Sequence, residues 1–133
     1  MTKEDVNNFE KTQAQLEGLL EEISVLAKKA PNDSVNKFKL KFINEILSVG
    51  NSILGNDYKP LGAFEQFNDE DLPTNSDVTF VLSQYLNCLE KLKIDNIYSS
   101  DKYGGGRYIG QEWLWLIDNS KSNIKTSAPK KYN

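Results

Sequence analysis

Apolar residues recur every three or four positions along much of the first 99 residues, which is the spacing of amphipathic helices. In the first such segment the spacing runs 3, 4, 3, 4 and 3 over one stripe: Phe9, Thr12, Leu16, Leu19, Ile23 and Leu26. Thr2 followed by Asp5 predicts a capping box at its start. Pro31 ends the segment, because proline disfavours the helical conformation of the preceding residue. We therefore expect a first helix of about 25 residues.

The second helical segment carries apolar residues on two faces. One face consists of Val35, Phe38, Phe42, Ile46 and Val49, and the other of Leu40, Ile43 and Leu47. Since one apolar stripe is enough to bury a helix against a core, two stripes predict a helix that is covered on two sides. Asp33 or Ser34 is a candidate N-cap, and the helix ends at Gly50 or runs on to Gly55.

A third helix is predicted to begin in the run 72–77, which contains a proline, a Thr or Asn cap and an aspartate in the first turn. We expect it to end near Tyr98. Its apolar face is Val78, Leu82, Tyr85, Leu89 and Leu92. Phe64 and Phe67 are expected to hold the connection over residues 55–73 against the core, because a free loop of this length is unusual.

The pattern changes after Ser100. The run 113–117 is short, apolar and aromatic, and a polar stretch separates it from Ile124, which predicts a β-hairpin. A short helix over residues 111–118 is the alternative, because a run of this length does not distinguish a strand from a helix.

The predicted fold class is therefore mainly α: a three-helix up-down bundle with a small C-terminal β-hairpin or short extra helix. With 133 residues the chain has the length of a single domain, residues 1–133. We divide it into a helical bundle over 1–99, a glycine-rich linker plus hairpin over 100–128, and a loose tail over 129–133.

Composition narrows the possible chemistry. The sequence contains no histidine, which removes the commonest general base and the commonest metal ligand. Cys88 is the only cysteine, which suits a reducing compartment, and no apolar run is long enough to span a bilayer. We expect a cytoplasmic protein without catalytic activity, metal, cofactor or membrane contact. The excess of lysine over arginine suits an AT-rich bacterial or phage genome.

The segment Gly104-Gly105-Gly106-Arg107 is a candidate anion-binding site. Backbone N–H groups of a glycine-rich turn can surround an anion, and the guanidinium of Arg107 is a bidentate donor. The lysine and Ser/Thr of a P-loop are missing, and the segment is predicted to follow a helix instead of a strand. The competing interpretation is a flexible linker.

The aromatic run is the candidate partner-binding site. Alternation in a strand places Trp113, Trp115 and Ile117 on one face and two leucines on the other. Both faces are apolar, so one is expected to cover the helices and the other needs a second cover, which is either this chain's own core or a partner protein. Tyr108 lies just before this run and is included in the site.

We therefore expect a small protein-interaction or regulatory module, such as an inhibitor, adaptor or antagonist, with another protein as its partner. A homodimer through the first helix is a further expectation. The alternative function is a nucleotide or nucleic-acid binder that uses Gly104–Tyr108 and the basic C-terminal segment, where residues 101–133 carry six basic and three acidic side chains. The acidic run 68–71 is interpreted as a solvated loop, because it lacks the spacing of an EF-hand.

Overall fold

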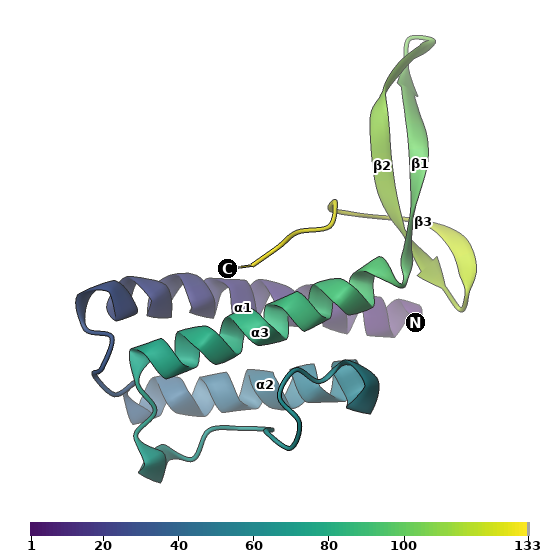
Figure 1. Ribbon diagram of the computed structural model, residues 1–133. Helices are drawn as coiled ribbons and strands as arrows, with labels where there is room; N and C mark the ends of the chain where they lie inside the picture. Colours follow the sequence, from purple (N-terminus) through teal and green to yellow (C-terminus); the bar gives the residue numbers. More distant parts are fainter. Residues whose placement is uncertain (133) are drawn as a thin grey trace.

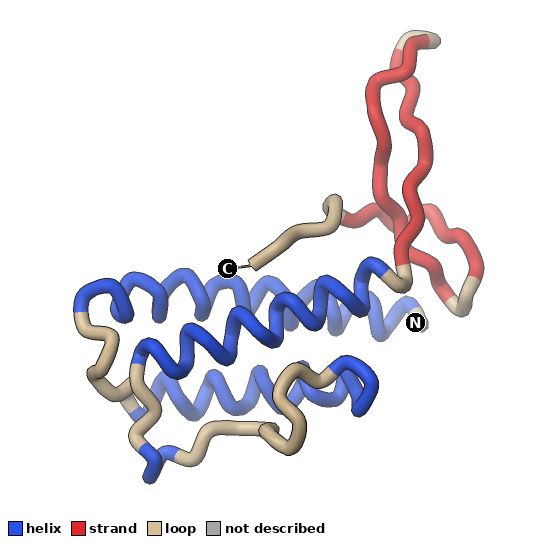
Figure 2. The backbone as a smooth tube through the Cα atoms, viewed as in Figure 1, coloured by secondary structure: helices blue, strands red, loops and turns tan. Residues whose placement is uncertain are grey.

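The computed structural model describes residues 1–132, which form three α-helices, one short 3-10 helix and three strands. Their bounds are α1 Lys3–Lys29, α2 Lys37–Tyr58, η1 Asp69–Asp71, α3 Asn75–Ile94, β1 Ile97–Gly104, β2 Arg107–Ile117 and β3 Ser120–Thr126. The helices lie side by side, and the sheet stands at one end with β1 and β2 projecting away from them (Figures 1 and 2). None of the helices in this range is both long and apolar enough to cross a membrane.

The predicted fold class is wrong in its C-terminal third. The chain ends in a three-stranded antiparallel sheet with the order β1-β2-β3, in place of a small hairpin or an extra helix. Residues 97–104, predicted to be the end of a helix and a linker, form a full strand that pairs with β2. The glycine-rich linker is therefore the turn of a longer hairpin. The alternative helix over 111–118 is wrong as well, since most of it lies in β2.

The helix starts follow from local side-chain chemistry. The predicted capping box of Thr2 and Asp5 is confirmed at α1, and Thr74 and Asp77 form a second one at α3. The N-cap of α2 is Asn36, instead of the predicted Asp33 or Ser34. Its side-chain Oδ1 accepts a hydrogen bond from the amide of Lys39.

The core lies between the three helices and receives the fully buried Trp115 from the sheet, with Ile97, Ile117 and Ile124 packed against it partly buried. The largest fully buried side chains include Trp115, Tyr85 and Phe9. The rings of Trp115 and Phe9 meet edge to face with their centroids 5.2 Å apart. This contact joins β2 to α1 and ties the sheet to the helices.

The connection between α2 and α3 is pinned as predicted. Phe64 and Phe67 pack against the core with their ring centroids 5.1 Å apart. The side chain of Asn44 donates to the carbonyl oxygen of Phe67 at 2.9 Å and accepts from its amide at 2.9 Å. A helix side chain therefore replaces the strand partner that this extended segment lacks.

The second apolar face of α2 is only partly covered within residues 1–132: Val35 is buried and Ile46 packs against the core, but the other three residues are exposed. Leu40, Ile43 and Leu47 are buried, whereas Phe38 is 72% exposed and Phe42 is 46% exposed. The prediction that this helix is covered on two sides is therefore wrong for the single chain. Large exposed apolar residues in a row usually mark a contact surface.

Candidate functional site: the β1–β2 arm

The outer part of the β1–β2 hairpin extends beyond the rest of the molecule. Strand β3 pairs with β2 only between Trp113 and Ile117, whereas β1 follows β2 out to the pair Gly104–Arg107. We call residues 100–112, which lie beyond β3, the arm. None of its residues is buried, and Figure 1 shows it pointing away from the helices. Its backbone therefore depends on its own hairpin hydrogen bonds.

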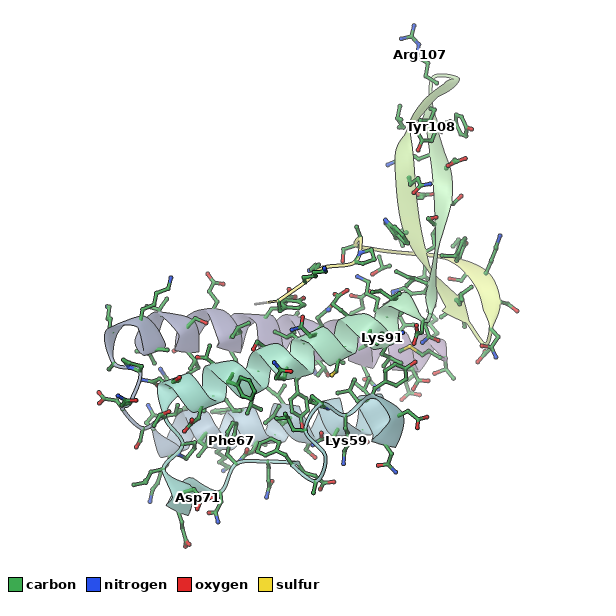
Figure 3. The ribbon with its side chains drawn as sticks, in the orientation of Figure 1. Lys59, Phe67, Asp71, Lys91, Arg107 and Tyr108 are labelled. Atoms are coloured by element: carbon green, nitrogen blue, oxygen red, sulfur yellow. The ribbon has the colours of Figure 1, made fainter. Side chains whose placement is uncertain are left out.

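Glycine forms the turn of the arm because the backbone requires it. Gly105 and Gly106 have φ of 58° and 77°, as both central residues of a type I′ turn must. A side chain at either position would strain this left-handed conformation. The turn accounts for two of the three glycines without any ligand. Arg107 follows directly and lies at the outer end of the arm (Figure 3).

A β-bulge interrupts the strand pairing behind the turn, where three large side chains are exposed. The register shifts between Lys102 and Tyr103, so Ile109 is left without a partner, and Gly110 has a φ of 127°. Tyr103 then lies opposite Tyr108, with their rings edge to face and 5.9 Å apart. We call Tyr103, Tyr108 and Ile109, which are 56–63% exposed, the tip cluster.

The arm carries no net charge. Its ionisable side chains are Asp101, Lys102, Arg107 and Glu112, two of each sign. Glu112 is paired with Lys125 of β3 at 3.3 Å. The site is therefore an apolar tip with one guanidinium beside it, which is chemistry suited to a protein surface.

The structure separates the predicted partner-binding residues. Tyr108 is exposed on the arm, whereas Trp115 is fully buried and its indole Nε1 donates to Glu10 Oε1 at 2.9 Å. Trp113 and Ile117 are half-buried, and Ile117 packs on the core. The assignment of Trp115 to a partner surface is therefore corrected: it anchors the sheet.

The opposite face of β2 also finds its cover within the chain. Leu114 is only 6% exposed and lies between its cross-strand neighbours Tyr98 and Lys125. Lys121 extends over the Tyr98 ring, with its Nζ 5.3 Å from the ring centroid. Leu114 therefore needs no partner protein as its cover, because aromatic and aliphatic parts of neighbouring residues lie beside it, while Leu116 is half-buried.

Sequence reasoning missed Tyr103 and Ile109. The pattern that could have found Tyr103 is the pair of tyrosines flanking Gly-Gly, because two central glycines are a recognised two-residue hairpin turn. Ile109 depends on the bulge, which shifts it out of the regular alternation.

A second concentration of polar chemistry is buried between α1, α3 and the C-terminal segment. Lys93 is fully buried, and its Nζ donates to Ser127 Oγ at 2.8 Å. Burial lowers the pKa of Lys93, against the opposing effect of Glu90 and Glu10. A lysine of lowered pKa is a typical nucleophile when substrate can reach it. Here the amine is sealed from solvent, so we assign it a structural role.

The C-terminal segment closes this polar cluster and is not loose. The amide of Lys130 donates to Glu90 Oε2 at 3.1 Å, and the hydroxyl of Tyr132 donates to Glu17 Oε2 at 2.8 Å. Asn87 on α3 exchanges two hydrogen bonds with the backbone of Tyr132. The predicted loose tail is therefore wrong for residues 129–132, and Asn133 lies outside the described residues.

The partly buried hydroxyl of Tyr132 leads us to expect that the folded protein loses stability at alkaline pH. Burial and then the bond to Glu17 raise the pKa of its hydroxyl above the ordinary 10.0. Above pH 10 the unfolded chain loses this proton while the folded chain keeps it, so stability falls as pH rises. We expect Tyr132→Phe to cost about 1 kcal/mol at pH 8 and to flatten the decline above pH 10.

Urea unfolding at pH 8 and pH 10.5, followed by circular dichroism, measures both effects. Tyr103→Phe on the exposed arm is the matched control. Equal declines for wild type and Tyr132→Phe would contradict the assignment.

The acidic run leaves no metal centre in view. Asp69–Asp71 form the exposed turn η1, whose first amides are capped by Asn68. Across residues 1–132, no group of three or more Cys, Asp or Glu side chains is arranged to hold a metal ion. The run acts as a polar corner between two segments of the chain.

Comparison with models of known protein families found no match, and comparisons with curated proteins and with solved structures found none. These comparisons therefore assign no role to the arm. The inference of function rests on its geometry.

Proposed function

We propose that this protein is a non-catalytic, cytoplasmic interaction or regulatory module that binds another protein through the β1–β2 arm. The observation that carries the proposal is the tip cluster: Tyr103 and Tyr108 pack edge to face, and they and the neighbouring Ile109 are exposed at the end of an arm that contributes no buried residue. Tyrosine and arginine are the residue types that most often anchor protein interfaces. A hairpin arm inserts such anchors into a partner's cleft with little loss of side-chain entropy.

A protein partner fits the arm better than a nucleic acid. Affinity for nucleic acid needs several cationic side chains facing phosphates, and the arm is neutral. The basic tail does not add to it, because Lys130 pairs with Glu17 at 3.2 Å alongside the helices while the arm projects away from them (Figure 1). The two halves of a nucleic-acid site are therefore apart.

The lack of catalysis and the compartment are supported by composition. No histidine is present, and the one lysine with a lowered pKa is buried. Cys88 is a free thiol whose pKa is raised by burial, so it is neither a disulfide partner nor an activated nucleophile.

Photo-crosslinking tests the arm directly. We expect a benzophenone amino acid at position 108 to capture a protein from the source cells, and the same probe at Phe80, an exposed residue of α3, to capture none of it. An excess of wild-type protein should compete for the adduct. Tyr103→Ser with Tyr108→Ser should compete at least tenfold less well, since two anchors are lost.

Three outcomes would contradict the proposal: no adduct at position 108, equal competition by the double variant, or an adduct removed by nuclease. The last would favour the nucleic-acid alternative. An unchanged melting temperature of the double variant establishes that the fold is intact, because both side chains lie outside the core.

A further inference from the structure

The uncovered side of α1 and α2 carries an apolar stripe with its own order. On α2 the stripe is Phe38, Phe42, Ile46, Val49 and Ile53, at spacings of 4, 4, 3 and 4. Beside it runs a groove of about 510 Å³, whose lining includes Gly18 and Leu19 of α1 and Phe42 of α2. We call this surface the α1–α2 face.

The charged residues on the α1 half of the face are ordered so that opposite charges meet when two copies of α1 lie antiparallel. Its exposed residues, at spacings of 7, 4, 3, 4 and 7, are Glu4, Lys11, Gln15, Gly18, Glu22 and Lys29. Laid antiparallel on a second copy, Glu4 meets Lys29 and Lys11 meets Glu22. Gln15 then meets Gly18, at which an added Cβ would meet nothing within 4 Å. A parallel arrangement would place like charges together at all four charged positions.

This antiparallel arrangement of two copies corresponds to a two-fold axis. The same axis fits the α2 half of the face. Glu22 of α1 is bonded to Lys39 of α2 at 2.8 Å, and Gln15 and Ile46 line the same groove. An axis between Gln15 and Gly18 therefore passes near Ile46. Around this point Phe42 of one copy lies opposite Val49 of the other.

One turn further out, Phe38 lies opposite Ile53. Each phenylalanine thus meets a smaller β-branched side chain, whereas a parallel pair would set phenylalanine against phenylalanine. Large-to-small pairing of this kind is how helix layers interdigitate.

We propose that two copies of this chain associate through the α1–α2 face, with α1 and α2 antiparallel to their counterparts about a two-fold axis. Phe38 and Phe42 alone expose on the order of 200 Å² of apolar area. Val25 and Val49, each about half exposed, add to this apolar area. The total approaches the apolar area that one partner buries in a protein interface of standard size. This face is separate from the arm, so the inference does not depend on the proposed function.

Molar mass in solution is the first test. We expect light scattering after size exclusion to give twice the chain mass of 15.1 kDa at concentrations near 100 µM. Phe42→Ser should raise the dimer dissociation constant at least tenfold, because it removes a buried aromatic side chain from the interface. Phe80→Ser is the matched control, since Phe80 is 56% exposed on α3, and it should leave the constant unchanged.

Charge reversal tests the antiparallel geometry. Lys11→Glu and Glu22→Lys should each weaken self-association, because each places like charges opposite one another in both halves of the dimer. Mixed in equal amounts, the two variants should form a heterodimer, since both pairs are then of opposite sign. Loss of the Glu22–Lys39 pair costs little folding stability because the Glu22 side chain is 54% exposed.

A wild-type chain that stays monomeric at 100 µM would overturn the proposal. So would a dimer that Phe42→Ser leaves intact, or one that the mixed variants fail to restore. A monomer that loses a different binding partner on Phe42→Ser would show that the face serves a foreign protein and would equally overturn self-association.

Discussion

Trp115→Ala is expected to lower the free energy of unfolding by about 3–5 kcal/mol, the usual cost of emptying a large aromatic site in a core. Trp115 is fully buried, and its edge-to-face contact with Phe9 holds the sheet on α1. Its loss also removes the indole donor from Glu10 Oε1, which otherwise accepts only from Thr126 at 3.2 Å among the bonds of residues 1–132.

Urea unfolding followed by far-ultraviolet circular dichroism measures this loss. Trp113→Ala is the matched control: the same side chain, two residues away and half-buried, should cost clearly less. A smaller effect at position 115 than at 113 would refute the assignment of Trp115 as the anchor of the sheet.

Glu90→Leu is expected to cost roughly 3 kcal/mol or more, because it strands several buried polar groups at once. Glu90 is 3% exposed and accepts from Gln13 Nε2 at 2.7 Å and from the amide of Lys130 at 3.1 Å. It is also the carboxylate that most favours the charged form of Lys93. Without it, the buried ammonium loses its main counter-charge.

Two comparisons separate this cause from a general packing defect. Adding Lys93→Met should recover at least about 1 kcal/mol, since the stranded charge is then gone. Burial lowers the pKa of Lys93 in the folded chain, so the unfolded chain binds more protons below its ordinary 10.5. The loss of unfolding free energy in Glu90→Leu, relative to wild type, should therefore become smaller as pH rises toward 10. A deficit independent of both Lys93 and pH would exclude the stranded charge as the cause.

The helices could be predicted from sequence because each buries a stripe at helical spacing and begins with a capping residue. Strand β1 could not. Its inner residue Ile97 faces the core, but from Ser99 outward it lies along the arm, where neither face is buried. A segment without a buried face carries no apolar period, so its polar residues were indistinguishable from a linker.

The sequence predicts the position of some candidate residues better than others. Arg107, proposed for anion binding, and Tyr108, proposed for partner binding, lie at the tip, whereas Trp115, also proposed for partner binding, is buried in the core. The apolar residues of a strand indicate that its faces must be covered, but not which segment of the chain covers them. Here Phe9, more than a hundred positions earlier, covers one face of β2, and Tyr98 covers the other. On α2 the second apolar stripe predicted a second cover, and the single chain leaves Phe38, Phe42 and Val49 exposed.

The separation of the arm from the core has an evolutionary consequence. Substitutions among residues 100–112 alter no buried contact. Under the proposed function, selection acts on them through what the arm binds and hardly at all through foldability. The turn glycines are the exception, since their backbone conformation constrains them. Such a protein can change partners in a few mutational steps while its helices stay unchanged. In a lineage under pressure to follow a moving target, the arm would diverge first.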